Sequence, residues 1–270
     1  MGFSMSFISE LSAAKKITPI VVCGAARSGT RMATDLLNIH NEVAIQNEMH
    51  AGTVEAYFEM LDKVKETFKL HSERKGRVLD GLWESSRCSL THAFLMSACK
   101  KGPVGAEKKA LRYHGIKTPG FERYFTKFEE AFSGSSPYYV YCVRSVDKVW
   151  SSWISLGYLT DVAVFKKRYE RSLRQAKAIK KASSERFVLF DLDAYASVAD
   201  KVKFVENNLF LPLGLSGSSE YVDLLEAAPN RNSLKRTGVK PIESNELKAQ
   251  MEMLKSCSVI SELRRDIGCL

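Results

Sequence analysis

The residues with the clearest chemical purpose form a short glycine loop, residues 24–30, which reads Gly24-Ala25-Ala26-Arg27-Ser28-Gly29-Thr30. Small residues allow backbone N–H groups to turn inward around phosphate oxygens. A helical pattern follows directly, and a helix N-terminus favours negative charge. The sequence therefore predicts a cradle for a nucleotide phosphate. Its candidate ligands are Gly24, Ala26, Arg27, Ser28, Gly29, Thr30 and the next residue, Arg31.

The position of the loop cation separates this loop from a Walker A motif. In that motif Lys and then Ser or Thr follow the last glycine. Here Thr30 and Arg31 follow Gly29, and the cation, Arg27, stands two residues before that glycine. A kinase or NTPase with an atypical loop remains an alternative, because Phe187 to Asp191 (FVLFD) can be an apolar strand that ends in a magnesium-binding Asp.

The string Arg27-Ser28-Gly29-Thr30 resembles the 5′-phosphosulfate loop of the sulfotransferases that use 3′-phosphoadenosine 5′-phosphosulfate (PAPS), which is commonly written K/R-S-G-T. That family has a second phosphate site, an Arg at the end of a later strand and a Ser eight residues on. The stretch YYVYCVRSVDKVWSS supplies both, as Arg144 and Ser152. The resemblance implies that these two residues hold the 3′-phosphate, that PAPS is the donor and its bisphosphate (PAP) the product, and that no metal takes part.

Two further stretches resemble sulfotransferase elements close to the transferring group. KTPGFERYF, which begins at Lys117, looks like the KTP element of some glycan sulfotransferases, and this gives Lys117 a role in charge stabilisation. LLNIHNEVAIQNE, which ends at Glu48, resembles the tyrosylprotein sulfotransferases, in which a helix ends, a short strand follows and a Glu is the catalytic base. By that spacing Glu48 is the base. Other subfamilies use His, so His50 and His114 stay as alternatives.

A basic segment near the C-terminus, Pro229 to Pro241 (PNRNSLKRTGVKP), is typical of a loop. Sulfotransferases close such a segment over the adenosine bisphosphate, so the resemblance adds its candidates Arg231, Lys235, Arg236 and Gly238. The expected activity is transfer of a sulfuryl group to an acceptor hydroxyl by in-line displacement. The acceptor stays open between a glycan, a glycolipid, a phenol and a tyrosine. A non-catalytic PAP-binding protein is the alternative from another class.

These motifs require a scaffold of alternating strands and helices. Ile17 to Cys23, Tyr138 to Val143 and Phe187 to Phe190 are apolar runs typical of buried parallel strands, and helical patterns follow them. We therefore expect an α/β protein with a three-layer P-loop-type fold, in which helices flank a central parallel sheet. We expect it to be one sulfotransferase-like domain over residues 1–270. An aromatic stripe predicts a further helix packed in the core: Phe121, Tyr124, Phe125, Phe128 and Phe132.

Composition and charge limit the class of protein. The 40 basic residues exceed the 31 acidic residues by nine, which favours an anionic partner. The long basic helix pattern from Val162 to Ser184 is interpreted as a solvated surface and not as a nucleic-acid site. Six scattered cysteines argue against a metal or disulfide framework. Because no apolar run is long enough and the start lacks a signal-peptide pattern, we expect no membrane span and a cytoplasmic protein.

Overall fold

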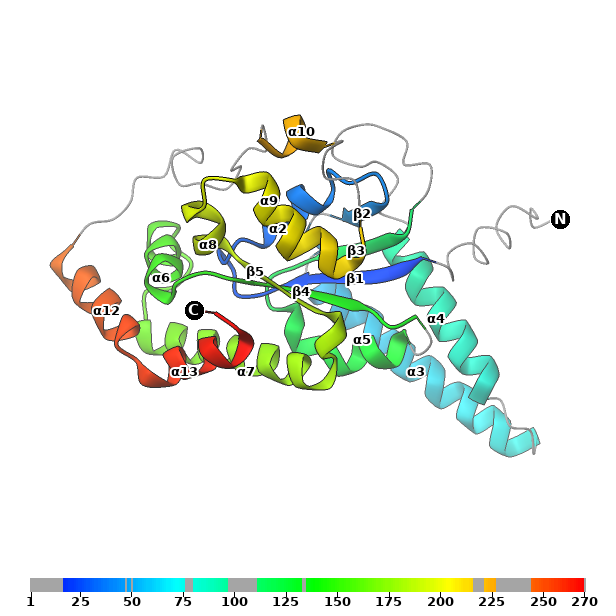
Figure 1. The fold of residues 1–270 in the computed structure, drawn as a ribbon. Coiled ribbons are helices and arrows are strands. Elements are labelled where there is room, and N and C mark those ends of the chain that lie inside the picture. Colours follow the sequence, from blue (N-terminus) through cyan, green and yellow to red (C-terminus); the bar gives the residue numbers. More distant parts are fainter. Residues whose placement is uncertain are drawn as a thin grey trace.

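A computed structural model of the chain describes residues 17–46, 48–49, 51–75, 80–96, 111–132, 135–215, 221–226 and 244–269. Five strands form one sheet in the order β2-β3-β1-β4-β5, and every neighbouring pair is parallel (Figure 1). Their bounds are β1 Thr18–Cys23, β2 Val43–Gln46, β3 Tyr113–Lys117, β4 Tyr138–Val143 and β5 Phe187–Asp191. The predicted central parallel sheet is confirmed.

Helices connect the strands and continue after the last one. Up to β5 these are α2 Thr30–Leu37, α3 Ala51–Lys75, α4 Asp80–Met96, η1 Phe121–Tyr124, α5 Phe125–Ala131, α6 Val146–Ser155, α7 Val162–Ala182 and η2 Ser184–Arg186. After β5 come α8 Leu192–Ser197, α9 Lys201–Val205, η3 Glu206–Phe210, η4 Leu211–Leu213, α10 Val222–Glu226, α12 Asn245–Lys255 and α13 Ser258–Ile267. Among the described residues, no helix is long and apolar enough to cross a membrane.

Each face of the sheet carries its own apolar core, because successive strand residues point to opposite faces. Val21 of β1 and Tyr141 of β4 pack in one core with α3, α5, α6, α7, α12 and α13. Ile20 and Val22 of β1 pack in the other core with α2, α9, η3 and α10. Figure 1 shows these two helical layers on either side of the strands. The expected three-layer fold is therefore confirmed.

β1 lies at the point where the order of the sheet reverses. It pairs with β3 on one side and with β4 on the other. The helix after β1, α2, belongs to one core, and the helices after β4, α6 and α7, belong to the other. Ligands of open α/β sheets bind outside the carboxyl ends of the strands at such a switch point. The fold therefore favours a ligand at the ends of β1 and β4.

Two elements differ from the sequence-based expectation. β3 (YHGIK) is no apolar run, yet all five of its residues are buried because it lies between β1 and β2. Gly115 permits the close approach of β1, since a Cβ at this position would lie 1.9 Å from the carbonyl oxygen of Ile20. The helix expected from the aromatic stripe begins as the 3-10 turn η1 and becomes α-helical only at Phe125.

Candidate functional site

The glycine loop joins the end of β1 to the start of α2. Gly24 has a φ of 131° and Gly29 a φ of 106°, which other residue types rarely adopt. Gly24 also lies against β4, where a Cβ would come within 2.2 Å of the carbonyl oxygen of Cys142. Both glycines are therefore required by the shape of the loop, and the loop lies directly beside the end of β4.

The start of α2 is suited to an anion. Its N-cap is Gly29, and within the described residues no side chain caps it. The first N–H groups of the helix are therefore left for another acceptor, and the helix dipole favours a negative one. Ser28, the residue before the cap, is 1% exposed, and its Oγ has no hydrogen-bond partner in the described part of the chain. A buried hydroxyl without a partner is costly, and a phosphate oxygen would satisfy it.

Arg27 turns toward the helix that follows β4. Its Nε donates a hydrogen bond to Ser152 Oγ at 2.8 Å, although the two residues are 125 positions apart. Next to this contact, Trp153 Nε1 donates to the carbonyl oxygen of Ala26 at 2.8 Å. Arg27 has a φ of 72°, a strained backbone conformation of the kind that gathers at ligand sites. The structure thus brings together one residue from each of the two predicted phosphate sites.

Arg144 directly follows β4, so it stands beside the end of β1. Its Nε is buried and makes no hydrogen bond within the described residues, and its ion pair with Asp193 Oδ1 is long, at 4.0 Å. Burial lowers the pKa of the Arg144 guanidinium; Asp193 partly offsets this effect, and Arg27 adds to it. Two cations that repel each other at the same edge of the sheet favour binding of a multiply charged anion between them.

The remaining predicted phosphate ligands add less evidence for an anion site. Thr30 is buried at the start of α2, and Arg31 forms an ion pair with Asp35 one turn along that helix, at 3.2 Å. Arg231, Lys235, Arg236 and Gly238 lie outside the described residues, as does His50.

Lys117 and Glu48 form an ion pair on the other side of β1. Lys117 ends β3 in register with Val22 of β1, and its Nζ lies 2.9 Å from Glu48 Oε2. The Lys117 side chain is only 2% exposed, whereas that of Glu48 is 61% exposed. Thr118 holds the neighbouring chain, because its Oγ1 donates to the Met49 carbonyl at 2.8 Å and accepts from the Met49 N–H at 3.2 Å. The site therefore combines a buried cation with a carboxylate that reaches solvent.

His114, the alternative base, occupies a different environment. It is fully buried on β3, and its Nε2 lies 2.9 Å from Nδ1 of His92 on α4. Burial, and then the charge that His92 would carry, lower the pKa of His114 to about 3. An imidazole enclosed between a strand and a helix does not reach an acceptor, so Glu48 is the better placed of the two described candidates.

Glu122, which the sequence-based reasoning missed, lies beneath the glycine loop. It is 3% exposed; its Oε2 accepts from the Gly24 N–H at 3.1 Å and its Oε1 accepts from Ser172 Oγ at 2.5 Å. Burial raises the pKa of this carboxyl, and the hydrogen bonds from Ser172 and Gly24 reduce the rise. Glu122 lies in the 3-10 turn η1, within the aromatic stripe, where no local pattern marks a buried carboxylate.

Asp191, the strand-end carboxylate of the kinase alternative, is engaged within the protein. Its Oδ1 accepts from the N–H groups of Asp193 and Ala194 and so caps α8. Its Oδ2 lies 3.6 Å from Nη2 of Arg264. With both oxygens so used, Asp191 has a structural role at the start of α8.

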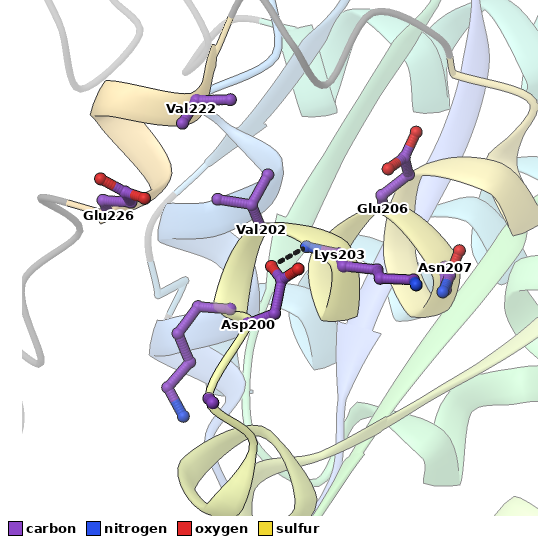
Figure 2. Close-up of a pocket in the computed structure, with 9 residues that line it drawn as sticks. Asp200, Val202, Lys203, Glu206, Asn207, Val222 and Glu226 are labelled. Atoms are coloured by element: carbon purple, nitrogen blue, oxygen red, sulfur yellow. Dashed lines mark hydrogen bonds between the residues drawn. The ribbon is translucent and has the colours of Figure 1, made fainter.

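A surface pocket of about 650 Å³ lies between α9, η3 and α10. Figure 2 shows the residues that line it. Its charged residues are of both signs: Asp200, Lys201, Lys203, Glu206 and Glu226. This mixture does not select an anion, and none of the predicted site residues that the structure describes lines the pocket. Among the side chains that the structure describes, no group of three or more His, Cys, Asp or Glu residues is placed to hold a metal ion.

In sequence, no family model and no curated protein matches this chain. In structure, it is similar to the sulfotransferase domain of the olefin synthase from Synechococcus PCC 7002, with a TM-score of 0.51 and 15% identity over 93% of this chain and 94% of that one. Sulfotransferase STF9 from Mycobacterium avium aligns with a TM-score of 0.49 and 13% identity over 98% and 81% of the two chains. Mouse SULT7A1, solved with PAP, aligns with a TM-score of 0.44 and 9% identity over 95% and 79%. The chain has the fold of a sulfotransferase domain, a statement that rests on the first of these.

Proposed function

We propose that this chain is a sulfotransferase, acting as one domain over residues 1–270, that transfers a sulfuryl group from PAPS to an acceptor hydroxyl. The observation that carries the proposal is the pairing of two phosphate-type sites at the ends of neighbouring strands. The glycine loop follows β1, Arg144 follows β4, and Arg27 Nε bonds Ser152 Oγ between them at 2.8 Å. One phosphate site would serve many nucleotides, whereas two adjacent sites suit a nucleotide with phosphates at both the 5′ and 3′ positions.

Several features of the described residues fit such a bisphosphate nucleotide. The buried Ser28 Oγ and Arg144 Nε are without hydrogen-bond partners among those residues. Gly24 leaves no room for a side chain beside β4, and α2 starts without a side-chain cap in the described region. Ser28, Thr30 and the loop N–H groups would hold the 5′ side, and Arg144 with Ser152 would hold the 3′-phosphate.

The chemistry would depend on alignment and on charge neutralisation. Bound PAPS would supply the sulfuryl group, whose bond to the 5′-phosphate breaks as the acceptor oxygen bonds to sulfur. Arg27 would offset the negative charge that builds up on the departing phosphate. Lys117 would offset the negative charge on the transferring group. Its side chain is buried, and its ion pair with Glu48 fixes the position of Nζ.

Glu48 would act as the general base. Its Oε2 is held by Lys117, and its Oε1 would take the proton of the acceptor hydroxyl as that oxygen attacks. A carboxylate that is 61% exposed can be reached by a glycan, a glycolipid, a phenol or a tyrosine side chain, so all four acceptor classes belong in the assay.

The test is radiolabel transfer from [³⁵S]PAPS to a panel of these four acceptor classes. We expect the wild type to label at least one class and Glu48→Gln to label it about a hundredfold or more slowly. Glu55→Gln is the matched control, because Glu55 is an exposed carboxylate that pairs with Arg123 on the surface. It should leave the rate within about twofold of the wild type, since exposed ion pairs contribute little.

A second outcome would favour another function for the same site. If the wild type binds PAP but labels no acceptor of any class, the chain is a PAP-binding protein without turnover. If Glu48→Gln labels the acceptor as fast as the wild type does, the assignment of the base is wrong.

A further inference from the structure

The peptide unit that follows β4 is held on both of its edges. The carbonyl oxygen of Arg144 accepts from the Tyr169 hydroxyl at 2.6 Å and from Nη1 of Arg264 at 2.8 Å. The N–H of Ser145, which belongs to the same peptide unit, donates to Asp193 Oδ2 at 2.5 Å. A planar peptide with fixed partners on both edges cannot rotate. The direction in which the Arg144 side chain leaves the backbone is therefore set by these three neighbours.

The Arg144 side chain itself has weaker constraints. Its Nε makes no hydrogen bond within the described residues, and its ion pair with Asp193 is long, at 4.0 Å. Asp193 is also shared with Lys148, whose Nζ lies 2.7 Å from the same oxygen. The guanidinium is thus held mainly through its backbone, and the two donors to the Arg144 carbonyl oxygen matter more than the contacts of the side chain.

These two donors come from helices outside the predicted phosphate motifs. Tyr169 lies on α7 and is 2% exposed, and Arg264 lies on the C-terminal helix α13. The Arg264 guanidinium also contacts the Tyr169 hydroxyl at 3.3 Å and Asp191 at the end of β5, at 3.6 Å. It therefore ties the end of β4 to the end of β5.

The helix that carries Arg264 is itself fixed. α13 lies against α7 (Figure 1). Its buried side chains Ile260, Leu263 and Ile267 belong to the same core as α7. Asp266 anchors it further, because its carboxylate pairs with Lys177 at 2.7 Å and its carbonyl oxygen accepts from Lys180 at 3.1 Å. A guanidinium on a docked helix can hold the Arg144 carbonyl in one orientation.

We infer that Arg264 and Tyr169 are positioning residues for recognition of the 3′-phosphate, and that the C-terminal helix α13 is part of the donor site. They act through the Arg144–Ser145 peptide and orient the Arg144 guanidinium. This inference rests on the proposed function, in which Arg144 binds the 3′-phosphate. It adds that selectivity for a 3′-phosphorylated nucleotide depends on a helix more than a hundred residues away in the sequence.

The test is a comparison of PAP with 5′-AMP, which lacks the 3′-phosphate, by calorimetry. We expect Arg264→Gln combined with Tyr169→Phe to weaken PAP binding about tenfold or more and to leave 5′-AMP binding within about twofold. Tyr169→Phe alone removes only a hydroxyl, keeps the ring in the core and should lower the PAP to 5′-AMP affinity ratio severalfold. A purely structural loss would weaken both ligands together and lower the thermal midpoint.

Two control variants match the chemical changes without touching the peptide. Arg265→Gln removes an exposed positive charge from the neighbouring position of α13, and Tyr57→Phe removes a buried hydroxyl that bonds Thr91 on α4. Both should retain the wild-type affinity ratio. The ratio of Arg264→Lys should lie between those of the wild type and Arg264→Gln, because an ammonium keeps the charge and can still donate but loses the planar fork of the guanidinium.

The outcomes separate the inference from the proposed function. An unchanged ratio in the double variant overturns the inference, and if that variant does not fold, an unchanged ratio in Tyr169→Phe alone overturns it. If the wild type itself binds PAP no better than 5′-AMP, the proposed 3′-phosphate site fails and the inference fails with it.

Discussion

The buried carboxyl of Glu122 offers the sharpest test of how this fold holds the glycine loop. Glu122 Oε2 is the acceptor for the Gly24 N–H at 3.1 Å, and the Gly24 carbonyl accepts from the Gly120 N–H at 2.9 Å. The first residue of the loop is therefore held on both sides. On the other side of the carboxyl, Ser172 Oγ donates at 2.5 Å and lies 2.9 Å from the Tyr141 hydroxyl.

Two substitutions at this position separate hydrogen bonding from charge. Glu122→Ala leaves the Gly24 N–H buried without an acceptor, which costs about 1–3 kcal/mol, and it also leaves a cavity. We expect a total loss of about 3 kcal/mol in the free energy of unfolding and weaker binding of PAP. Glu122→Gln keeps the acceptor, because the amide oxygen can face Gly24 while its NH₂ group donates to Ser172. It should unfold within about 1 kcal/mol of the wild type near pH 5.

The pH dependence gives a second, independent result. Burial raises the pKa of Glu122 above its ordinary value of 4.5, so the native state holds this proton more tightly than the unfolded chain does. The stability from this group is complete below pH 4.5 and is lost as the pH rises through the native pKa. Glu122→Gln does not titrate, so it should gain stability relative to the wild type as the pH rises above 4.5.

The assay is urea unfolding followed by far-UV circular dichroism between pH 5 and pH 8, together with calorimetry of PAP. Glu185→Ala, an exposed carboxylate on η2, is the control and should change the unfolding free energy by less than about 0.5 kcal/mol. Equal losses of stability in Glu122→Gln and Glu122→Ala, or wild-type unfolding of Glu122→Ala, would contradict this role of the Glu122 carboxyl.

Three further predictions follow from single residues. Gly24→Ala should lower the free energy of chemical unfolding by about 3 kcal/mol or more. Gly120→Ala should lower it by only about 1 kcal/mol, because Gly120 has a φ of 84° but no described atom lies within 4 Å of the new Cβ. Equal losses in the two variants would show that the contact of Gly24 with β4 is not the cause. Burial lowers the pKa of His114 to about 3 in the fold, against 6.5 in the unfolded chain. The free energy of unfolding of the wild type should therefore fall relative to that of His114→Gln as the pH drops below 6.5, by about 2 kcal/mol at pH 5. The same pH dependence of the unfolding free energy in both proteins would contradict this. Lys117→Met should keep most of the stability, since an apolar side chain of similar size replaces a buried cation, but should slow [³⁵S] transfer about a hundredfold or more; an unchanged rate would remove Lys117 from the mechanism.

The parts of the fold that could be predicted are those for which a pattern of consecutive residues indicates the element. β1, the glycine loop and α2 are adjacent in sequence, and Arg144 and Ser152 lie on one strand and the helix that follows it. The contact between Arg27 and Ser152 spans 125 positions, yet it follows once β1 and β4 are known to be neighbours. The strand and helix that carry each motif were therefore predictable from the sequence, whereas the use of the two motifs as phosphate sites stays a prediction.

The parts that could not be predicted depend on contacts that no local pattern records. β3 has an ordinary mixed composition and is buried only because it occupies an inner position of the sheet. Glu122 is a polar residue within an aromatic stripe, and its burial depends on contacts with Gly24 and Ser172, which lie 98 and 50 positions away in the sequence. Arg264 lies on a helix that carries no motif, and its role depends on the docking of α13 on α7. Lys117, in contrast, was predicted as a functional residue on its motif, but its burial was not.

The measurement that tests the central claim most directly is calorimetric titration of the wild-type chain with PAP, with and without magnesium, and with ATP and magnesium. We expect PAP to bind tightly, magnesium to leave its affinity unchanged, and Arg144→Ala to weaken its binding about tenfold or more. Magnesium-dependent binding of ATP without binding of PAP would contradict the proposed PAPS site and would make a kinase the leading alternative.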